Sequence, residues 1–343
     1  MGDLEHRLRD QARHCRGYGS ALTGALLEGA ADDLVAGGVV ADLLGPHADD
    51  PSGSVPALRF AGALHRLVLE RQAPELALHY PSVGGTASVE DVWPAAERAC
   101  REHLDRLREL VRRPVQTNEV GRAAVLMGVL QLLPGPLRLL EVGASAGLNL
   151  RCDRYAYLVG DDVLGDPESP VRLEQPWEGA WPAYRVPDVR ARKGCDPDPI
   201  DPTTTEGRLT LTSYVWGDHV ERLERLRGAL DVAQRVPASV ERLGALDFLT
   251  RELADTPGDV TTVVWHSVVM QYVDPQERAA IDKLLAEHRG GPVVRAAMEP
   301  EREGDGFVFR VRITRWPGGE SAHVADAHGH GPPVVWTGAT LSS

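Results

Sequence analysis

The residues best suited to chemistry lie in one short run near the middle of the chain. An apolar stretch from Leu137 to Val142 contains Glu141 near its end, and five small residues follow it. A strand that ends in an acid and enters a turn of small residues lets the backbone pass close to a ligand. If a helix follows, its free amides favour an anionic or polar group. The run therefore predicts a ligand site that includes Glu141, Gly143, Ala144, Ser145 and Gly147.

The letters GASAG in this run also match the G-x-S-x-G turn of α/β-hydrolases, in which Ser145 would be the nucleophile. In those enzymes several strands and an oxyanion loop precede the turn. The chain before Leu137 has helical patterns and no such loop, so a nucleoside-type site is preferred. A serine hydrolase and a turn that merely packs closely remain as alternatives.

A second set of candidates follows later strands. Trp265-His266-Ser267 ends one apolar run, Tyr272 comes shortly after it, and Glu299 ends the next. Ligands of parallel α/β sheets bind at the carboxyl ends of the strands. Histidine can accept and donate a proton near neutral pH, which favours His266 as a general base. Glu299 is predicted to orient either a substrate amine or this histidine.

A polar cluster precedes the first predicted strand. Its members are candidates for substrate binding, although Asn118 or its neighbour Thr117 could simply cap the next helix. Asn149, which follows the small-residue turn, is also a candidate for substrate binding. The predicted substrate-binding residues are Gln116, Asn118, Glu119, Arg122 and Asn149.

The first third of the chain is predicted to be helical, because apolar residues recur at spacings of three and four. Residues 1–115 are assigned to a helical domain that covers the substrate. The predicted helices span Leu4–Cys15, Ala21–Leu27, Ala57–Arg71 and Ala95–Arg112, with a further helix at Val120–Leu133.

From residue 116 onward, short apolar runs alternate with helical patterns, which predicts a Rossmann-like, doubly wound and mostly parallel α/β sheet. Residues 161–205 are rich in Asp, Pro and Gly and are treated as an irregular insertion. An antiparallel edge is predicted from 307–316 and 333–336. The other predicted strands are Leu137–Val142, Leu209–Trp216, Ser239–Leu243, Val260–His266 and Pro292–Met298, and the predicted helices are Gly147–Arg154, Asp218–Val232 and Pro275–His288.

Composition narrows the possible partners. The 343 residues carry a net charge of −13, which disfavours nucleic acid as a partner because phosphates would be repelled. The four cysteines are scattered and the histidines lack ligand clusters, so neither a disulfide framework nor a metal site is predicted. No apolar run is long enough to span a membrane. A cytoplasmic protein that acts on a small molecule is expected.

The 137–149 run resembles the first motif of class I S-adenosylmethionine-dependent methyltransferases, with Ser145 in place of the middle glycine. More broadly, the chain is similar to an actinobacterial family with a methyltransferase-like fold. This resemblance rests on LRFAGALHRLVLE, HYPSVGG, QTNEVGR, EVGASAGLNL, Trp216-Gly217-Asp218, WHSVVMQYV and the tail with His328-Gly329.

The resemblance implies two further acids that hold the cofactor. Glu174 is the candidate at the end of the second strand, where methyltransferases bind the ribose hydroxyls. Asp247, which follows the third predicted strand, resembles the acid that accepts the adenine amino group.

Three functional hypotheses follow. The first is S-adenosylmethionine-dependent methylation of a small molecule. The second keeps the fold without the cofactor and performs an intramolecular substitution in natural-product biosynthesis, such as aziridine ring closure with loss of sulfate. That substrate could be bound to a carrier, and a partner subunit is compatible with it. The third is a non-catalytic scaffold.

Overall fold

The computed structural model describes residues 2–256, 258–304 and 306–339. The chain forms two compact units, each built from two segments. The first unit contains residues 1–117 and 204–224, and the second contains 118–203 and 225–343.

The first unit is helical, as the apolar spacing predicts. Its core is formed mainly by leucine, alanine and valine side chains of the first seven α-helices. The predicted helix at 95–112 is two helices, because the backbone leaves the helical conformation at His103. The α-helices are α1 (Gly2–Gly17), α2 (Ala21–Val35), α3 (Val39–Leu44), α4 (Pro56–Leu69), α5 (Pro74–Ala77), α6 (Val92–Glu102), α7 (Leu104–Leu110) and α9 (Thr205–Ser213).

Helix α9 corrects one prediction, because residues 209–216 were expected to form a strand. The hydroxyl group of Thr204 accepts a hydrogen bond from the Gly207 amide and caps the helix. The Thr212 hydroxyl donates to the Arg208 carbonyl one turn earlier, which satisfies this β-branched residue inside a helix. The alternation of apolar and polar residues is therefore overridden by a capped helical turn.

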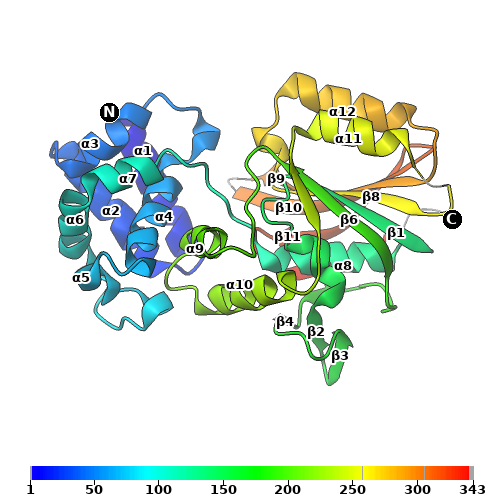
Figure 1. Cartoon of the computed structure of the whole chain (residues 1–343), viewed down its shortest axis with the longest axis horizontal. Coiled ribbons are helices and arrows are strands. Elements are labelled where there is room, and N and C mark those ends of the chain that lie inside the picture. Colours follow the sequence, from blue (N-terminus) through cyan, green and yellow to red (C-terminus); the bar gives the residue numbers. More distant parts are fainter. Residues whose placement is uncertain (1, 257, 305, 340–343) are drawn as a thin grey trace. The chain divides into compact units, whose positions relative to one another are not determined.

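The second unit is built on a nine-stranded, mostly parallel sheet with the order β5-β12-β11-β10-β9-β8-β1-β6-β7 (Figure 1). Strands β7, β6, β1, β8 and β9 pair in parallel, and β10, β11 and β12 continue in antiparallel pairs. The strands are β1 (Pro136–Val142), β5 (Trp177–Gly179), β6 (Asp188–Asp196), β7 (Ser239–Arg242), β8 (Thr261–Ser267), β9 (Val293–Glu303), β10 (Gly306–Trp316), β11 (Glu320–His328) and β12 (Gly331–Trp336).

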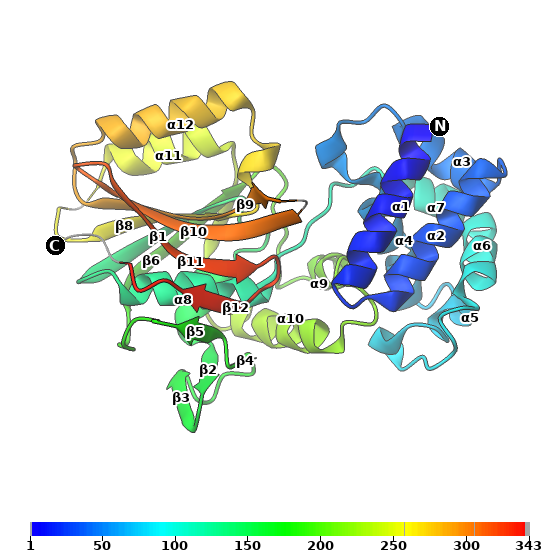
Figure 2. The same cartoon turned by 180° about the vertical axis from the view of Figure 1, so that it is seen from behind.

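Helices cover both faces of this sheet. Helices α11 (Ala245–Ala254) and α12 (Pro275–Glu287) lie on one face, and α8 (Ala123–Gln131) lies on the other (Figures 1 and 2). The residues of α8 are all buried, in keeping with an apolar sequence on every side. Helix α10 (Val220–Ala233) carries the chain from the first unit into the second.

Two features of the second unit agree with the sequence prediction. No strand precedes β1 among the described residues, so the small-residue turn follows the first strand of the sheet. The antiparallel edge is also present, formed by β10 and β12 with β11 between them.

The structure corrects the predicted irregular insertion in part, because residues 161–205 contain four strands. Strand β6 is central to the large sheet, and β5 lies at its edge. Strands β3 (Asp162–Gly165) and β4 (Arg172–Glu174) join β2 (Ala156–Val159) in a separate three-stranded sheet. The charged side chains of this segment are paired across elements, as Arg192 is with Asp153 and Lys193 with Glu252, so they do not prevent strand formation.

Candidate active site

The carboxyl ends of the parallel strands bring most of the candidate residues to one edge of the sheet. Because β6, β1, β8 and β9 are consecutive parallel neighbours, Asp196, Glu141, His266 and Glu299 lie at or near the same edge. This edge is where α/β sheets bind their ligands.

The small-residue turn after β1 has a left-handed backbone at three positions. The φ angles are +68° at Gly143, +52° at Ser145 and +66° at Gly147. A Cβ atom on Gly143 would lie 2.4 Å from Cγ2 of Val269, and one on Gly147 would lie 2.8 Å from Cγ2 of Val240. Glycine is thus required at both positions by backbone conformation and by packing. Ser145 adopts this costly conformation without being glycine, as residues at functional sites do.

The amides of this turn are bonded within the protein, which corrects the expectation that they face a ligand. The Ser145 amide donates to Oδ2 of Asp196 at 2.9 Å, and the Ala146 and Leu148 amides donate to Oδ1 of Asn118 at 3.3 and 2.9 Å. The predicted helix after the turn is a short 3₁₀ segment, Asn149–Arg154, with Arg151 outside helical geometry. Ligand contacts at this turn must therefore come from side chains.

Asp196 is the site residue that the sequence analysis missed. It is buried at the end of β6, and its Oδ1 accepts the Asp198 amide at 2.9 Å. The available signal was the alternation of Val189 and Ala191 with two arginines, which Lys193 interrupts. Glu174, the predicted second acid, lies exposed on β4 in the small sheet, which is not part of the large sheet.

Glu141 is buried in a setting that favours its neutral form. Burial raises the pKa of its carboxyl group to about 8, the nearby Arg151 opposes this shift, and the charge of Asp196 adds to it. A hydrogen-bonding contact with Trp265, its register partner on β8, lowers the pKa of this carboxyl group again, while Oε2 makes no hydrogen bond of good geometry within the described residues. A buried carboxyl oxygen with such a weak partner is available to a polar ligand.

Other buried polar atoms nearby lack partners as well. Among the described residues, none bonds the hydroxyl of Ser145 or Oδ1 of Asn149, and Nε1 of Trp265 contacts Glu141 without a hydrogen bond of good geometry. The missing partner of the Ser145 hydroxyl also argues against the hydrolase alternative, which needs a base within hydrogen-bond distance. These atoms are buried polar groups at or near the carboxyl ends of β1 and β8 that a polar ligand or a water molecule can bond.

His266 and Glu299 form a pair, which fits one of the two roles predicted for Glu299. Nδ1 of His266 lies 2.7 Å from Oε1 of Glu299, and the Val269 amide donates to the same oxygen at 3.1 Å. A carboxylate only accepts hydrogen bonds, so Nδ1 carries the proton and Nε2 carries the lone pair of the neutral ring. This arrangement orients a histidine that can take a proton at Nε2.

Three further candidates, Arg122, Glu119 and Tyr272, differ in the residues that they contact. Arg122 donates to the carbonyl groups of Ser267 and Gly329, and so links the end of β8 to the β11–β12 turn. Glu119 contacts His330 of that turn at 3.3 Å. Tyr272 is 57% exposed, yet the protein around its hydroxyl raises the pKa of the phenol, with Arg122 opposing and Glu299 adding to the shift.

Two candidates lie elsewhere. Gln116 is buried and belongs to the first unit. Asp247 is exposed in the first turn of α11, just after β7. Since β7 pairs with β6 and the Leu243 amide donates to the Asp196 carbonyl, Asp247 follows a strand end beside Asp196.

In the described part of the chain, no group of three or more His, Cys, Asp or Glu side chains is arranged to hold a metal ion. Within the same residues, no helix combines the length and apolar character needed to cross a membrane.

A family model matches residues 5–336 of the chain, and its description is "Uncharacterized protein conserved in bacteria (DUF2332)". No curated protein and no solved structure matches the sequence.

Proposed function

We propose that this chain, which belongs to the bacterial DUF2332 family, is a methyltransferase that uses S-adenosylmethionine and a small-molecule acceptor. The observation that carries the proposal is the group of buried, unpaired polar atoms beside the turn after β1. They call for a polar ligand, and their chemistry fits one that bears hydroxyl groups and positive charge.

The balance of charge supports this ligand over an anion. Glu141 and Asp196 flank the turn, and the turn amides that an anion would need donate to Asp196 and Asn118. A sulfate or phosphate group would find neither free amides nor a favourable field there. A cationic sulfonium or ammonium group next to the two acids is favoured, because its positive charge would lower the raised pKa of Glu141 and ionise that carboxyl group.

The strand order gives further support. Five parallel strands in the order β7-β6-β1-β8-β9 place the turn after the central strand, with an acid at the end of the neighbouring strand β6. Nucleoside-binding sheets use such an acid for ribose hydroxyls. We assign Asp196 to the ribose in place of Glu174, Glu141 to the ammonium group and Asp247 to the adenine.

When bound, S-adenosylmethionine supplies an electrophilic methyl group on a positively charged sulfur. The protein contributes a base: Nε2 of His266 takes the proton of the acceptor hydroxyl or amine. Glu299 keeps the ring in the required tautomer and stabilises the imidazolium that forms, while the Val269 amide holds Glu299 in place. Arg122 fixes the end of β8, from which His266 projects.

A second candidate is an intramolecular substitution that needs no cofactor, with the same pair as the base. It would use the paired His266 and Glu299 in the same way, since the pair needs no cofactor to accept a proton. The amides of the turn after β1 do not favour it, because they are already bonded within the protein. The idea that these amides hold a leaving sulfate is not supported by their bonding. Turnover in the absence of S-adenosylmethionine would select this candidate.

Methyl transfer can be tested directly with labelled cofactor. Purified protein is incubated with methyl-labelled S-adenosylmethionine and a small-molecule extract of the bacterium that carries the chain. We expect label in the small-molecule fraction, and a loss of roughly 100-fold or more in His266→Asn. His288→Asn, at the end of α12, is the matched control and should keep full activity. Label transfer that is equal in His266→Asn and wild type would exclude the proposed base.

A further inference from the structure

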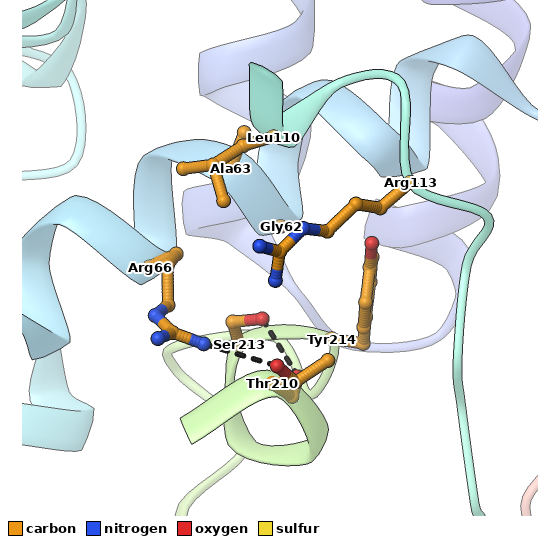
Figure 3. A pocket seen from close by; sticks show the side chains of 8 residues that line it. All are labelled: Gly62, Ala63, Arg66, Leu110, Arg113, Thr210, Ser213 and Tyr214. Carbon is orange, nitrogen blue, oxygen red and sulfur yellow. Dashed lines mark hydrogen bonds between the residues drawn. The ribbon is translucent and has the colours of Figure 1, made fainter. Parts of the chain in front are cut away.

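A second polar feature belongs to the first unit, where a pocket lies among α4, α7 and α9. It is a small hollow that is partly open to solvent, and its lining includes Arg66, Arg113, Thr210, Ser213 and Tyr214. Figure 3 shows the guanidinium group of Arg66 directed at Thr210, with the guanidinium group of Arg113 reaching toward the same hollow. None of these residues has a part in the methyl-transfer proposal.

The wall of the pocket depends on a glycine. A Cβ atom on Gly62 of α4 would lie 2.8 Å from Cδ1 and Cε1 of Tyr214. Without that atom, the aromatic ring packs directly against the backbone of α4. Substitution at Gly62 would push Tyr214 into the space that the two arginines face.

The two arginines share one carboxylate. Arg66, whose side chain is only 3% exposed, pairs with Oε2 of Glu206, and Arg113 donates to Oε1 of Glu206 at 2.9 Å. Arg66 also donates to the Thr210 hydroxyl at 3.0 Å and to Glu70 at 2.7 Å. The carboxylate therefore bridges two guanidinium groups with one oxygen each, as a phosphate or sulfate group would.

Glu206 is well placed to be replaced. It lies in the first turn of α9, and its side chain is 58% exposed, whereas Arg66 beneath it is buried. Because Arg66 also pairs with Glu70, its buried charge stays compensated when Glu206 leaves, so displacement of the exposed carboxylate costs little. A doubly charged oxyanion that bonds both arginines would interact more strongly than a single carboxylate.

We infer that this pocket is an oxyanion-binding site, in which Glu206 occupies Arg66 and Arg113 until a phosphate group displaces it. The phosphate comes either from free inorganic phosphate or from the phosphate ester of a small molecule. The Thr210 hydroxyl, which bonds Arg66, and the phenol of Tyr214 complete the surroundings. This inference is independent of the methyl-transfer proposal, because it involves other residues and another ligand.

Calorimetric titration of the full chain with inorganic phosphate and with glycerol phosphate, at constant ionic strength, tests the inference. In Glu206→Gln we expect the dissociation constant to fall at least tenfold, since the competing charge is removed. Adding Arg113→Gln to that variant should weaken binding at least tenfold. Whichever of the two compounds binds more tightly identifies the source of the phosphate.

Glu75→Gln is the matched control, because Glu75 forms a similarly exposed pair with Arg98 in the same unit. It should leave the dissociation constant unchanged. Thermal unfolding of each variant verifies that it is folded. The inference is overturned if folded Glu206→Gln binds phosphate no more tightly than wild type, or if Glu75→Gln shows the same gain in affinity. It is also overturned if adding Arg113→Gln does not weaken phosphate binding.

Discussion

Glu141 and Glu206 have opposite surroundings, and the contrast separates the two polar regions of the molecule. Glu141 is buried in the second unit, its Oε2 atom makes no hydrogen bond of good geometry with the described residues, and burial raises its pKa to about 8. Glu206 is exposed in the first unit, and hydrogen bonds from Arg66 and then Arg113 lower its pKa to about 2.

The difference shows what each region needs from a ligand. At the turn after β1 the protein leaves polar atoms unsatisfied, so a ligand would remove a cost that the folded protein otherwise bears. In the pocket of the first unit the charges are already satisfied, so a ligand must compete with an internal carboxylate. We therefore expect ligand binding to stabilise the second unit more than the first.

The largest expected effect concerns the pH dependence that Glu141 imposes on stability. Its folded-state pKa of about 8 lies above the usual value of 4.5. The stability that the neutral carboxyl group adds to the folded protein is therefore fully present below about pH 4.5. It is lost as the pH rises through 8. Relative to Glu141→Gln, we expect the free energy of unfolding of the wild type to fall by about 4 kcal/mol between pH 5 and 8.

Urea unfolding of both proteins across this pH range measures the effect. If the free energy of unfolding changes with pH in the same way in wild type and Glu141→Gln, Glu141 is not held in its neutral form. The two glutamates would then not differ as described.

A smaller effect is expected from Gly143→Ala, with Gly135→Ala as its control. Both glycines have positive φ, +68° and +73°, but a Cβ atom on Gly135 would meet nothing within 4 Å, whereas one on Gly143 would overlap Val269. We expect a loss of about 1 kcal/mol at Gly135 from backbone strain alone, and about 2–4 kcal/mol at Gly143. Chemical denaturation measures both.

The double variant Gly143→Ala with Val269→Ala isolates the packing component of that loss. If Val269 is the obstacle, the two substitutions will be less costly together than the sum of the single variants. Strict additivity would show that the turn after β1 is not packed as described.

The smallest effect is expected at Glu206. Its lowered pKa means that its contribution is present above about pH 4.5 and is lost as the pH falls toward 2, which is opposite in sign to Glu141. Because the side chain is 58% exposed, solvent screening limits this contribution to less than about 1 kcal/mol. Urea unfolding of Glu206→Gln and wild type between pH 3 and 6 should show a small gap that closes at low pH. A gap that widens at low pH would contradict the assigned ion pairs.

The sequence predicted those parts of the site whose signal is local. The turn after β1 was recognisable from its small residues, and β8 and β9 from their apolar runs. Because those strands are parallel neighbours, His266 and Glu299 could be expected to meet once each was placed at a strand end. Nothing in the sequence specified that Nδ1 rather than Nε2 would face the carboxylate.

Other parts depend on contacts between distant segments. Strand β6 was missed because its charged residues are paired with Asp153 and Glu252, partners that lie far away along the chain, and Asp196 was missed with it. The association of 204–224 with the first unit depends in the same way on Asp218, which accepts hydrogen bonds from Ser20 and Leu22. The pattern of apolar and polar residues along the sequence does not show which distant residues will be partners.

A thermal-unfolding titration with S-adenosylmethionine shows whether the acids and the buried polar atoms beside β1 bind that compound. Asp196→Asn is compared with Asp188→Asn, which alters the exposed acid at the other end of β6. We predict stabilisation by about 2.7 kcal/mol at a hundredfold excess over the dissociation constant, in wild type and in Asp188→Asn, and a marked loss in Asp196→Asn. No stabilisation of the folded wild-type protein at millimolar S-adenosylmethionine would contradict the account.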